Sequence, residues 1–355
     1  MLRLATAGES HGPALIGIVS GLPAGLTVDR DAIDADLARR QQGYGRSPRQ
    51  QIEEDRVEVL AGLRHGRTLG TPLAFLVQNR DHKNWKWGMS PWPPAGEASG
   101  KGTKRVTLPR PGHADLAGAL KFGHDDVRNT LERASARQTA VTVAAGALAK
   151  ALLAELEIEV AGSVVQMGDV DEARADRDTV GGVVEVRARG APPGLGSYST
   201  KEERLDARLA AALMGTQAVK GVEIGDGFAL ANLRGSQAHD EILRDERGVY
   251  RETNRAGGLE GGVSNGEEIV VRAAMKPLPT LMQPLRSVDL ESGEPGEALV
   301  ERSDTAAVDA LSVVAEASVG FELARAAREK FGGDSVHDFV AAYRAYVERI
   351  PWQPR

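Results

Sequence analysis

The segments that resemble strands and helices predict an α+β fold, because they do not alternate in the regular order of a βαβ array. Glycine is abundant at 41 residues, whereas aromatic residues make up 4% of the chain, so many tight turns are expected. We see no repeat and no linker that would divide the sequence. We therefore expect one large domain over residues 1–355, although a chain of this length also allows two.

The N-terminal segment is expected to form two strands on either side of a glycine-rich turn, followed by a helix. Residues 2–5 and 14–19 have the composition of short strands. Asp29 is a favoured N-cap residue for a helix over 31–41, and Gly43 is expected to end that helix.

Two further strands, 57–61 and 72–78, are expected to be joined by a turn around Gly70 and Thr71. Residues 81–110 then hold most of the tryptophans and show no periodicity. A loop of that length in a compact domain is usually functional or mobile.

The middle of the chain predicts a long helix that starts at Asp125 or Asp126 and ends near Leu156. Its later part, TAVTVAAGALAKALLAEL, is rich in alanine on most sides, which is typical of a helix packed closely against others in an interior. The other expected elements are strands 158–166, 182–186 and 268–273, and helices 202–214, 306–330 and 336–347.

The composition excludes several classes of function. There is no cysteine, so disulfides, thiolate catalysis and cysteine-bound zinc or iron–sulfur centres are ruled out. No apolar run is long enough to span a membrane, and the N-terminus lacks a signal-peptide pattern, so a cytoplasmic protein is expected. The net charge of −6 argues against general affinity for nucleic acid.

The arginines are clustered beside glycine turns. A single arginine is usually a solvated surface residue, but several together favour a polyanionic small ligand, because guanidinium groups bind phosphate and carboxylate in a bidentate manner. The clusters are Arg39, Arg40, Arg46 and Arg49; Arg105 and Arg110; and Arg128, Arg133 and Arg137.

Two histidines have similar surroundings. His11 lies in AGESHGPAL and His113 in RPGHADL, each next to glycine and near an arginine cluster. One histidine on a loop is more often idle than catalytic, but two in the same setting favour proton transfer near neutral pH. No zinc-type spacing is found among the seven histidines, so no metal site is expected.

Other motifs near these residues are weak. The run around Ser10 matches G-x-S-x-G, which allows a serine hydrolase, but that motif needs a strand, a sharp turn and a helix. GEASGKGT has the wrong spacing for a P-loop, and GGLEGG has the wrong order of glycines for a dinucleotide fingerprint.

Seven motifs occur in order over essentially the whole chain: AGESHGPAL, RRQQGYGRSPRQ, RPGHADLAGALKFGHDDVRNTLERASARQTA, GVEIGDGF, NRAGGLEGG, MKPLPT and ERSD. Together they resemble the chorismate synthase family. Two places depart from that pattern: Asp309 stands where the family usually has proline, and the segment 165–178 is shorter than in many relatives.

The resemblance implies a β-α-β sandwich, with helices packed between antiparallel sheets, and assembly as a homotetramer. It implies a lyase that eliminates phosphate from 5-enolpyruvylshikimate 3-phosphate to give chorismate, at the end of the shikimate pathway. Reduced FMN would be required although the reaction has no net redox change. Members of the family are sometimes assigned NADP at Arg40 and Arg46. Here we expect NADPH only as an indirect reductant, with an external flavin reductase or other reductant.

The resemblance also implies roles for individual residues. His11 would protonate the leaving phosphate, His113 would protonate the reduced flavin near N1, Asp304 would accept a proton from flavin N5, and Ser10 would orient its neighbours. Substrate would bind to Arg40, Arg46, Arg49, Arg110 and Arg137. Flavin would lie on Arg133, Ala134, Ser135, Gln217, Ala218, Gly261, Lys276, Pro277, Leu278, Pro279, Thr280 and Arg302.

Three alternatives remain open from the sequence. Ser10 could be a hydrolase nucleophile. The chain could also be a flavin-binding or nucleotide-binding module without catalysis, which would bind FMN but release no phosphate. Asp304 could instead cap a helix that starts at 305–307, where aspartate is a favoured residue.

Overall fold

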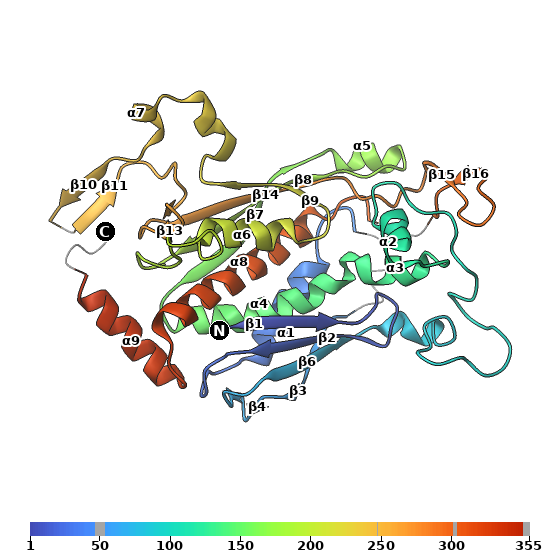
Figure 1. Cartoon of the computed structure of the whole chain (residues 1–355), viewed down its shortest axis with the longest axis horizontal. Helices are drawn as coiled ribbons and strands as arrows, with labels where there is room; N and C mark the ends of the chain where they lie inside the picture. Colours follow the sequence, from blue (N-terminus) through green and yellow to red (C-terminus); the bar gives the residue numbers. More distant parts are fainter. Residues whose placement is uncertain (47–53, 247, 301–303, 351–355) are drawn as a thin grey trace.

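The computed structural model describes residues 1–46, 54–246, 248–300 and 304–350. It confirms the expected mixture of helices and antiparallel sheets in an α+β chain. Two four-stranded sheets lie on opposite sides of a layer of helices (Figure 1). No helix within the described ranges is long and apolar enough to cross a membrane.

The first sheet has the order β1-β2-β6-β3, and every neighbouring pair is antiparallel. Side chains of β2 alternate between the interior and solvent, so that Leu15 and Val19 are buried while Ile16 and Ile18 are exposed. A small hairpin, β4 and β5, lies between β3 and β6, where only a turn was expected. The strands are β1 (Arg3–Ala7), β2 (Ala14–Ser20), β3 (Val57–Ala61), β4 (Leu63–Arg64), β5 (Arg67–Thr68) and β6 (Leu73–Gln78).

The second sheet has the order β7-β8-β14-β9 and is also antiparallel throughout. The three strands expected in this region are confirmed, with ends that differ by up to three residues. The strands are β7 (Glu159–Met167), β8 (Gly182–Arg189), β9 (Val219–Ile224) and β14 (Ile269–Met275).

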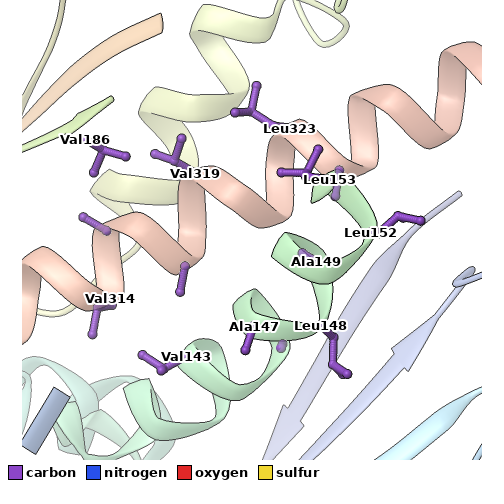
Figure 2. Close-up of a cluster of buried hydrophobic side chains, with 14 of the residues drawn as sticks. Val143, Ala147, Leu148, Ala149, Leu152, Leu153, Val186, Val314, Val319 and Leu323 are labelled. Atoms are coloured by element: carbon purple, nitrogen blue, oxygen red, sulfur yellow. The ribbon is translucent and has the colours of Figure 1, made fainter. Parts of the chain in front are cut away.

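Helices α1 (Arg30–Gln41), α4 (Thr139–Ala154) and α8 (Val308–Phe331) form the layer between the sheets. Asp29 caps α1 through a hydrogen bond from the Asp31 N–H, as expected. The α4 and α8 helices pack directly on each other through alanine, valine and leucine side chains. Gly146 allows this close approach, because a Cβ there would lie 2.3 Å from the Ala317 Cβ. Val319 of α8 lies beside Val186 of β8, whereas Leu148 and Leu152 of α4 lie on the side of the first sheet (Figure 2).

One expectation in this region is wrong. The long helix predicted from Asp125 or Asp126 to Leu156 is two helices, α3 (Arg128–Ala134) and α4, separated by the short 3-10 turn η3 (Ala136–Gln138). Ser135 is extended between them, with φ −64° and ψ 140°, and its hydroxyl accepts a hydrogen bond from the Arg137 N–H. That local hydrogen bond stabilises a turn where composition alone favours continued helix.

The remaining elements cover the ends and edges of these layers (Figure 1). They are η2 (Arg80–Asn84), α2 (Asp115–Phe122), α5 (Val170–Ala175), α6 (Leu205–Met214), η4 (Gly227–Asn232), α7 (Gly235–Ala238), β10 (Ile242–Asp245), β11 (Gly248–Arg251), β12 (Leu259–Glu260), β13 (Val263–Ser264), β15 (Arg286–Val288), β16 (Pro295–Glu297) and α9 (Val336–Glu348).

Candidate active site

A cavity of about 390 Å³ brings together residues from distant parts of the chain. It lies where the turn after β1, the end of α1, the break between α3 and α4, and the segment after β14 meet. The expected site residues that line it are Ser10, His11, Arg40, Arg46, Arg110, His113, Ala134, Ser135, Arg137, Gln217, Ala218, Lys276, Leu278, Pro279, Thr280 and Asp304.

Five expected site residues are not placed in this lining. Arg133 instead donates hydrogen bonds to the Thr6 and Gly8 carbonyls, and it lines a second hollow that also includes Gln217. Gly261 lies in the turn between β12 and β13, and Pro277 is absent from the lining although its neighbours are present. Arg49 and Arg302 lie outside the described residues.

The break after α3 forms one wall of the cavity. Ala134, Ser135, Ala136 and Arg137 all line it, and they do so because the helix stops at Ala134 and restarts at Thr139. The difference between the expected single helix and the observed pair therefore falls at the candidate site.

His11 is buried and held on two sides. Its Nδ1 lies 2.9 Å from Glu132 Oε1, and its backbone N–H donates to Glu132 Oε2 at 2.8 Å. The imidazole also stacks on Trp85, with ring centroids 3.9 Å apart. Burial alone would raise the pKa of Glu132, but hydrogen bonds from His11 and the charges of His11 and Arg128 lower it. A charged Glu132 can only accept a hydrogen bond, so it fixes Nδ1 of His11 as a proton donor.

The surroundings of Ser10 do not resemble a hydrolase nucleophile. The turn that carries it joins β1 and β2, which pair as antiparallel strands, so no strand–turn–helix elbow is formed. The Ser10 hydroxyl accepts a hydrogen bond from the Ser135 hydroxyl at 3.2 Å.

Like His11, His113 is held at Nδ1 by a carboxylate. This carboxylate belongs to Asp115, two residues further along the chain. The Nδ1 of His113 lies 2.5 Å from Asp115 Oδ1, and Arg110 Nε donates to the other oxygen of Asp115 at 2.8 Å. Arg110 Nη1 also reaches the Thr280 hydroxyl at 2.9 Å. Burial would raise the pKa of Asp115, but its hydrogen bonds from His113 and Arg110, and their charges, hold it well below its usual range.

Two arginines share one buried carboxylate at another wall of the cavity. Asp55 Oδ2 accepts hydrogen bonds from Arg40 Nη1 at 3.1 Å and Arg137 Nη1 at 2.8 Å. Arg40 Nε also donates to the Thr139 hydroxyl at 2.8 Å. Burial, assisted by the charges of Arg137 and Arg46, lowers the pKa of Arg40 to about 10, so this guanidinium remains charged at neutral pH.

Arg46 and Asp304 form an ion pair of 2.8 Å, and both side chains are nearly buried. The alternative in which Asp304 caps a helix is wrong, because α8 begins at Val308 and its N-cap residue is Ala307. Asp304 therefore belongs to the cavity rather than to the helix end.

Several residues of this site had no role assigned from the sequence. Glu132 and Asp115 lie inside the motif that also holds His113. Their presence in that motif was the signal from which they could have been identified as site residues. Trp85 lies far along the chain from His11, and Asp55 lies 82 residues from Arg137, so no local pattern identifies either contact.

The side chains at the cavity carry a net positive charge. Among the described residues, five cationic side chains line the cavity, while three carboxylates pair with four of them. Two imidazoles held by carboxylates add groups of the kind that act as general acids and bases. Together these features fit the class of enzymes that bind a small polyanion and transfer protons.

The comparisons with known proteins identify which such enzyme family this is. A family model described as chorismate synthase matches residues 2–173 and 167–327. The chain is 54% identical over 387 residues to a chorismate synthase of Desulforudis audaxviator (strain MP104C), covering 99% of this chain and 98% of that protein. It is 52% identical over 394 residues to one from Geotalea uraniireducens (strain Rf4), with 99% of each covered. A crystal structure of a chorismate synthase is 35% identical, with a TM-score of 0.77 and 98% of each chain covered. The chain belongs to the chorismate synthase family.

The Asp115 pair predicts a dependence of stability on pH. The folded-state pKa of Asp115 lies below its unfolded value, so the stabilisation is present above the unfolded pKa and is lost as pH falls through the folded pKa. Asp115→Asn should lower the free energy of unfolding at pH 7 by about 3 kcal/mol, because Arg110 loses its buried partner. Below about pH 4 the difference between variant and wild type should shrink. Urea titrations at several pH values measure this, and a difference that stays constant with pH would contradict it.

Proposed function

We propose that this cavity is the active site for the chorismate synthase reaction. The enzyme is a carbon–oxygen lyase: it eliminates phosphate and a ring hydrogen, in 1,4-anti geometry, from 5-enolpyruvylshikimate 3-phosphate to give chorismate, with no net redox change. The observation that supports the location most strongly is that cationic side chains and both carboxylate-held histidines line one cavity. The substrate carries a phosphate and two carboxylates, which are the groups that guanidinium binds best.

The substrate-binding residues are proposed to be Arg40, Arg46, Arg110 and Arg137, with Arg49 as expected from the sequence. The first four line the cavity, and three different segments supply them. Their carboxylate partners hold them in place before a ligand arrives, which reduces the entropy cost of binding.

The enzyme uses a reduced flavin, and we propose that the flavin is FMN. The residues present fit such a group: Ala218 has a left-handed φ of +68°, an uncommon conformation for alanine that turns the Gln217–Ala218 backbone beside the cavity. Lys276 and Thr280 add a cation and a hydroxyl on the same wall, and burial lowers the pKa of Lys276, with the charge of Lys220 contributing. Arg133, Gly261, Pro277 and Arg302 are proposed to complete this site as the family motifs imply.

Bound reduced flavin supplies the electron density that assists departure of the allylic phosphate. His11 is proposed to donate a proton from Nε2 to the leaving phosphate, while Glu132 holds Nδ1. His113 is proposed to hold a proton near flavin N1, while Asp115 binds the Nδ1 of His113.

Asp304 is proposed as the final acceptor of the ring proton, and Arg46 fixes the direction of the Asp304 carboxylate. Ser10 is proposed to keep the Ser135 hydroxyl, and hence the wall after α3, in place.

We further propose that the layers described above are the β-α-β sandwich of the family, in one domain over residues 1–355. One continuous hydrophobic core that joins both sheets supports this. A homotetramer is proposed as well, because Ile16 and Ile18 expose apolar surface on the outer face of the first sheet. A cytoplasmic site of action, with an external reductant and NADPH only as its indirect source, fits the need to keep the flavin reduced.

The reaction itself gives the test of this proposal. With 5-enolpyruvylshikimate 3-phosphate and photochemically reduced FMN under anaerobic conditions, the chain should release phosphate and chorismate in equal amounts. With oxidised FMN and no reductant it should release neither, because the electron density needed at the C–O bond is missing. Turnover with oxidised FMN alone would contradict the proposal. Binding of FMN without any phosphate release would favour the non-catalytic module.

The histidine roles predict a specific kinetic defect. His11→Asn and His113→Asn each keep an amide donor near the position of Nδ1, so the carboxylate partner stays satisfied, but neither can transfer a proton. Turnover should fall by about 10²–10⁴-fold in each variant, while substrate still binds. His337→Asn is the control, since His337 is highly exposed on α9 and far from these carboxylates in sequence. Near-normal turnover in both site variants would contradict the assignment.

A further inference from the structure

The loop that carries Arg46 to the cavity rests on the segment before α8. Gly43 and Gly45 have φ values of +129° and +91°, and a Cβ at Gly43 would lie 2.6 Å from Asp309 Oδ2. The Thr305 N–H donates to the Gly45 carbonyl at 2.8 Å. These close contacts fix the loop against residues 305–309.

Tyr44, in the middle of this loop, is bound at its backbone and at its ring by two different helices. Its N–H donates to Asp309 Oδ2 at 3.0 Å, in the first turn of α8. Its hydroxyl donates to Asp171 Oδ1 at 2.6 Å, in the first turn of α5. The Arg174 guanidinium lies 5.2 Å from the tyrosine ring and 3.3 Å from the same Asp171 oxygen, so the phenol is held on its face as well.

Arg46 follows two residues after Tyr44 and lines the cavity. Its Nη1 pairs with Asp304, which comes from the same segment as Asp309. Its Nε is buried and has no hydrogen-bond partner among the residues that the structure describes. A shift of the loop would move this guanidinium relative to the cavity that it lines.

We infer that Asp309 and Asp171 are positioning residues, which act through Tyr44 to set where Arg46 meets the anionic substrate. This inference rests on the proposed function of the cavity.

The test separates substrate binding from turnover. Asp309→Ala removes the acceptor and should raise the KM for 5-enolpyruvylshikimate 3-phosphate by about fivefold, the effect of one hydrogen bond, while kcat changes by less than about twofold. Asp309→Asn keeps a carbonyl acceptor and should restore the wild-type KM. Tyr44→Phe removes the bond to Asp171 and should raise KM in the same direction. Tyr198→Phe, at a highly exposed tyrosine, is the matched control.

A double-mutant cycle with Arg46 tests whether the effect passes through that residue. In an Arg46→Ala background, Asp309→Ala should change KM by less than about twofold, because the group it positions is gone. Calorimetric Kd values for the substrate, measured with oxidised FMN to prevent turnover, should follow the same order.

The inference is overturned if Asp309→Ala leaves KM and Kd unchanged, if Asn does not restore them, or if the fivefold effect persists without Arg46. A loss of unfolding free energy with no change in KM would likewise assign these contacts to structure alone. Failure of the proposed function is distinguishable, because the wild-type chain would then release no phosphate with reduced FMN.

Discussion

A carboxylate with no exposed side-chain surface, Asp55, is the constraint on which the cavity depends. It accepts hydrogen bonds from Arg40 and Arg137, which would otherwise place two unpaired guanidinium groups near each other in a medium of low dielectric constant. An unpaired buried ion costs several kcal/mol. The shared carboxylate offsets part of this cost, and Thr139, Ala136, Asn79 and Gln78 accept further hydrogen bonds from the two guanidinium groups. Both cationic groups are therefore held in place at the cavity before any ligand enters it.

Other carboxylates bind arginine or histidine side chains around the cavity in the same way. Arg46 is paired with Asp304, Arg110 and His113 share Asp115, and His11 is bound by Glu132. Burying each pair has a desolvation cost that the contacts between the paired groups do not fully offset. The compensating free energy must therefore come from elsewhere in the fold. The buried interface of α4 and α8 between the two sheets is the largest apolar source (Figure 2). An anionic ligand that binds the cationic groups of the cavity in the folded chain alone should stabilise the fold.

Local sequence patterns were sufficient for part of this structure. The Asp29 cap, the turn between the first two strands and the alanine-rich interior helix each follow from neighbouring residues, and the structure has all three. The glycine-rich turn suggested an exposed His11, but the imidazole is buried against Trp85 and Glu132. The break at Ser135 could not be predicted in this way, because residues 125–156 have helical composition throughout and a side-chain hydrogen bond decides the turn. The partner of His11 lies 121 residues away, so no spacing in the sequence pairs it with Glu132. Asp304 was ambiguous for the same reason, since its partner Arg46 comes from the other end of the chain.

The central point is that buried carboxylates fix the reactive groups before a ligand binds. Nitrogen NMR of the chain with labelled histidine tests it most directly, with His11→Asn used to assign the His11 signals. In the neutral ring of ligand-free His11, the proton should reside on Nδ1, because a charged Glu132 carboxylate can only accept a hydrogen bond. Glu132→Gln should weaken this preference. A neutral His11 with its proton on Nε2, unchanged by Glu132→Gln, would show that the carboxylate does not control the imidazole and would contradict the central point.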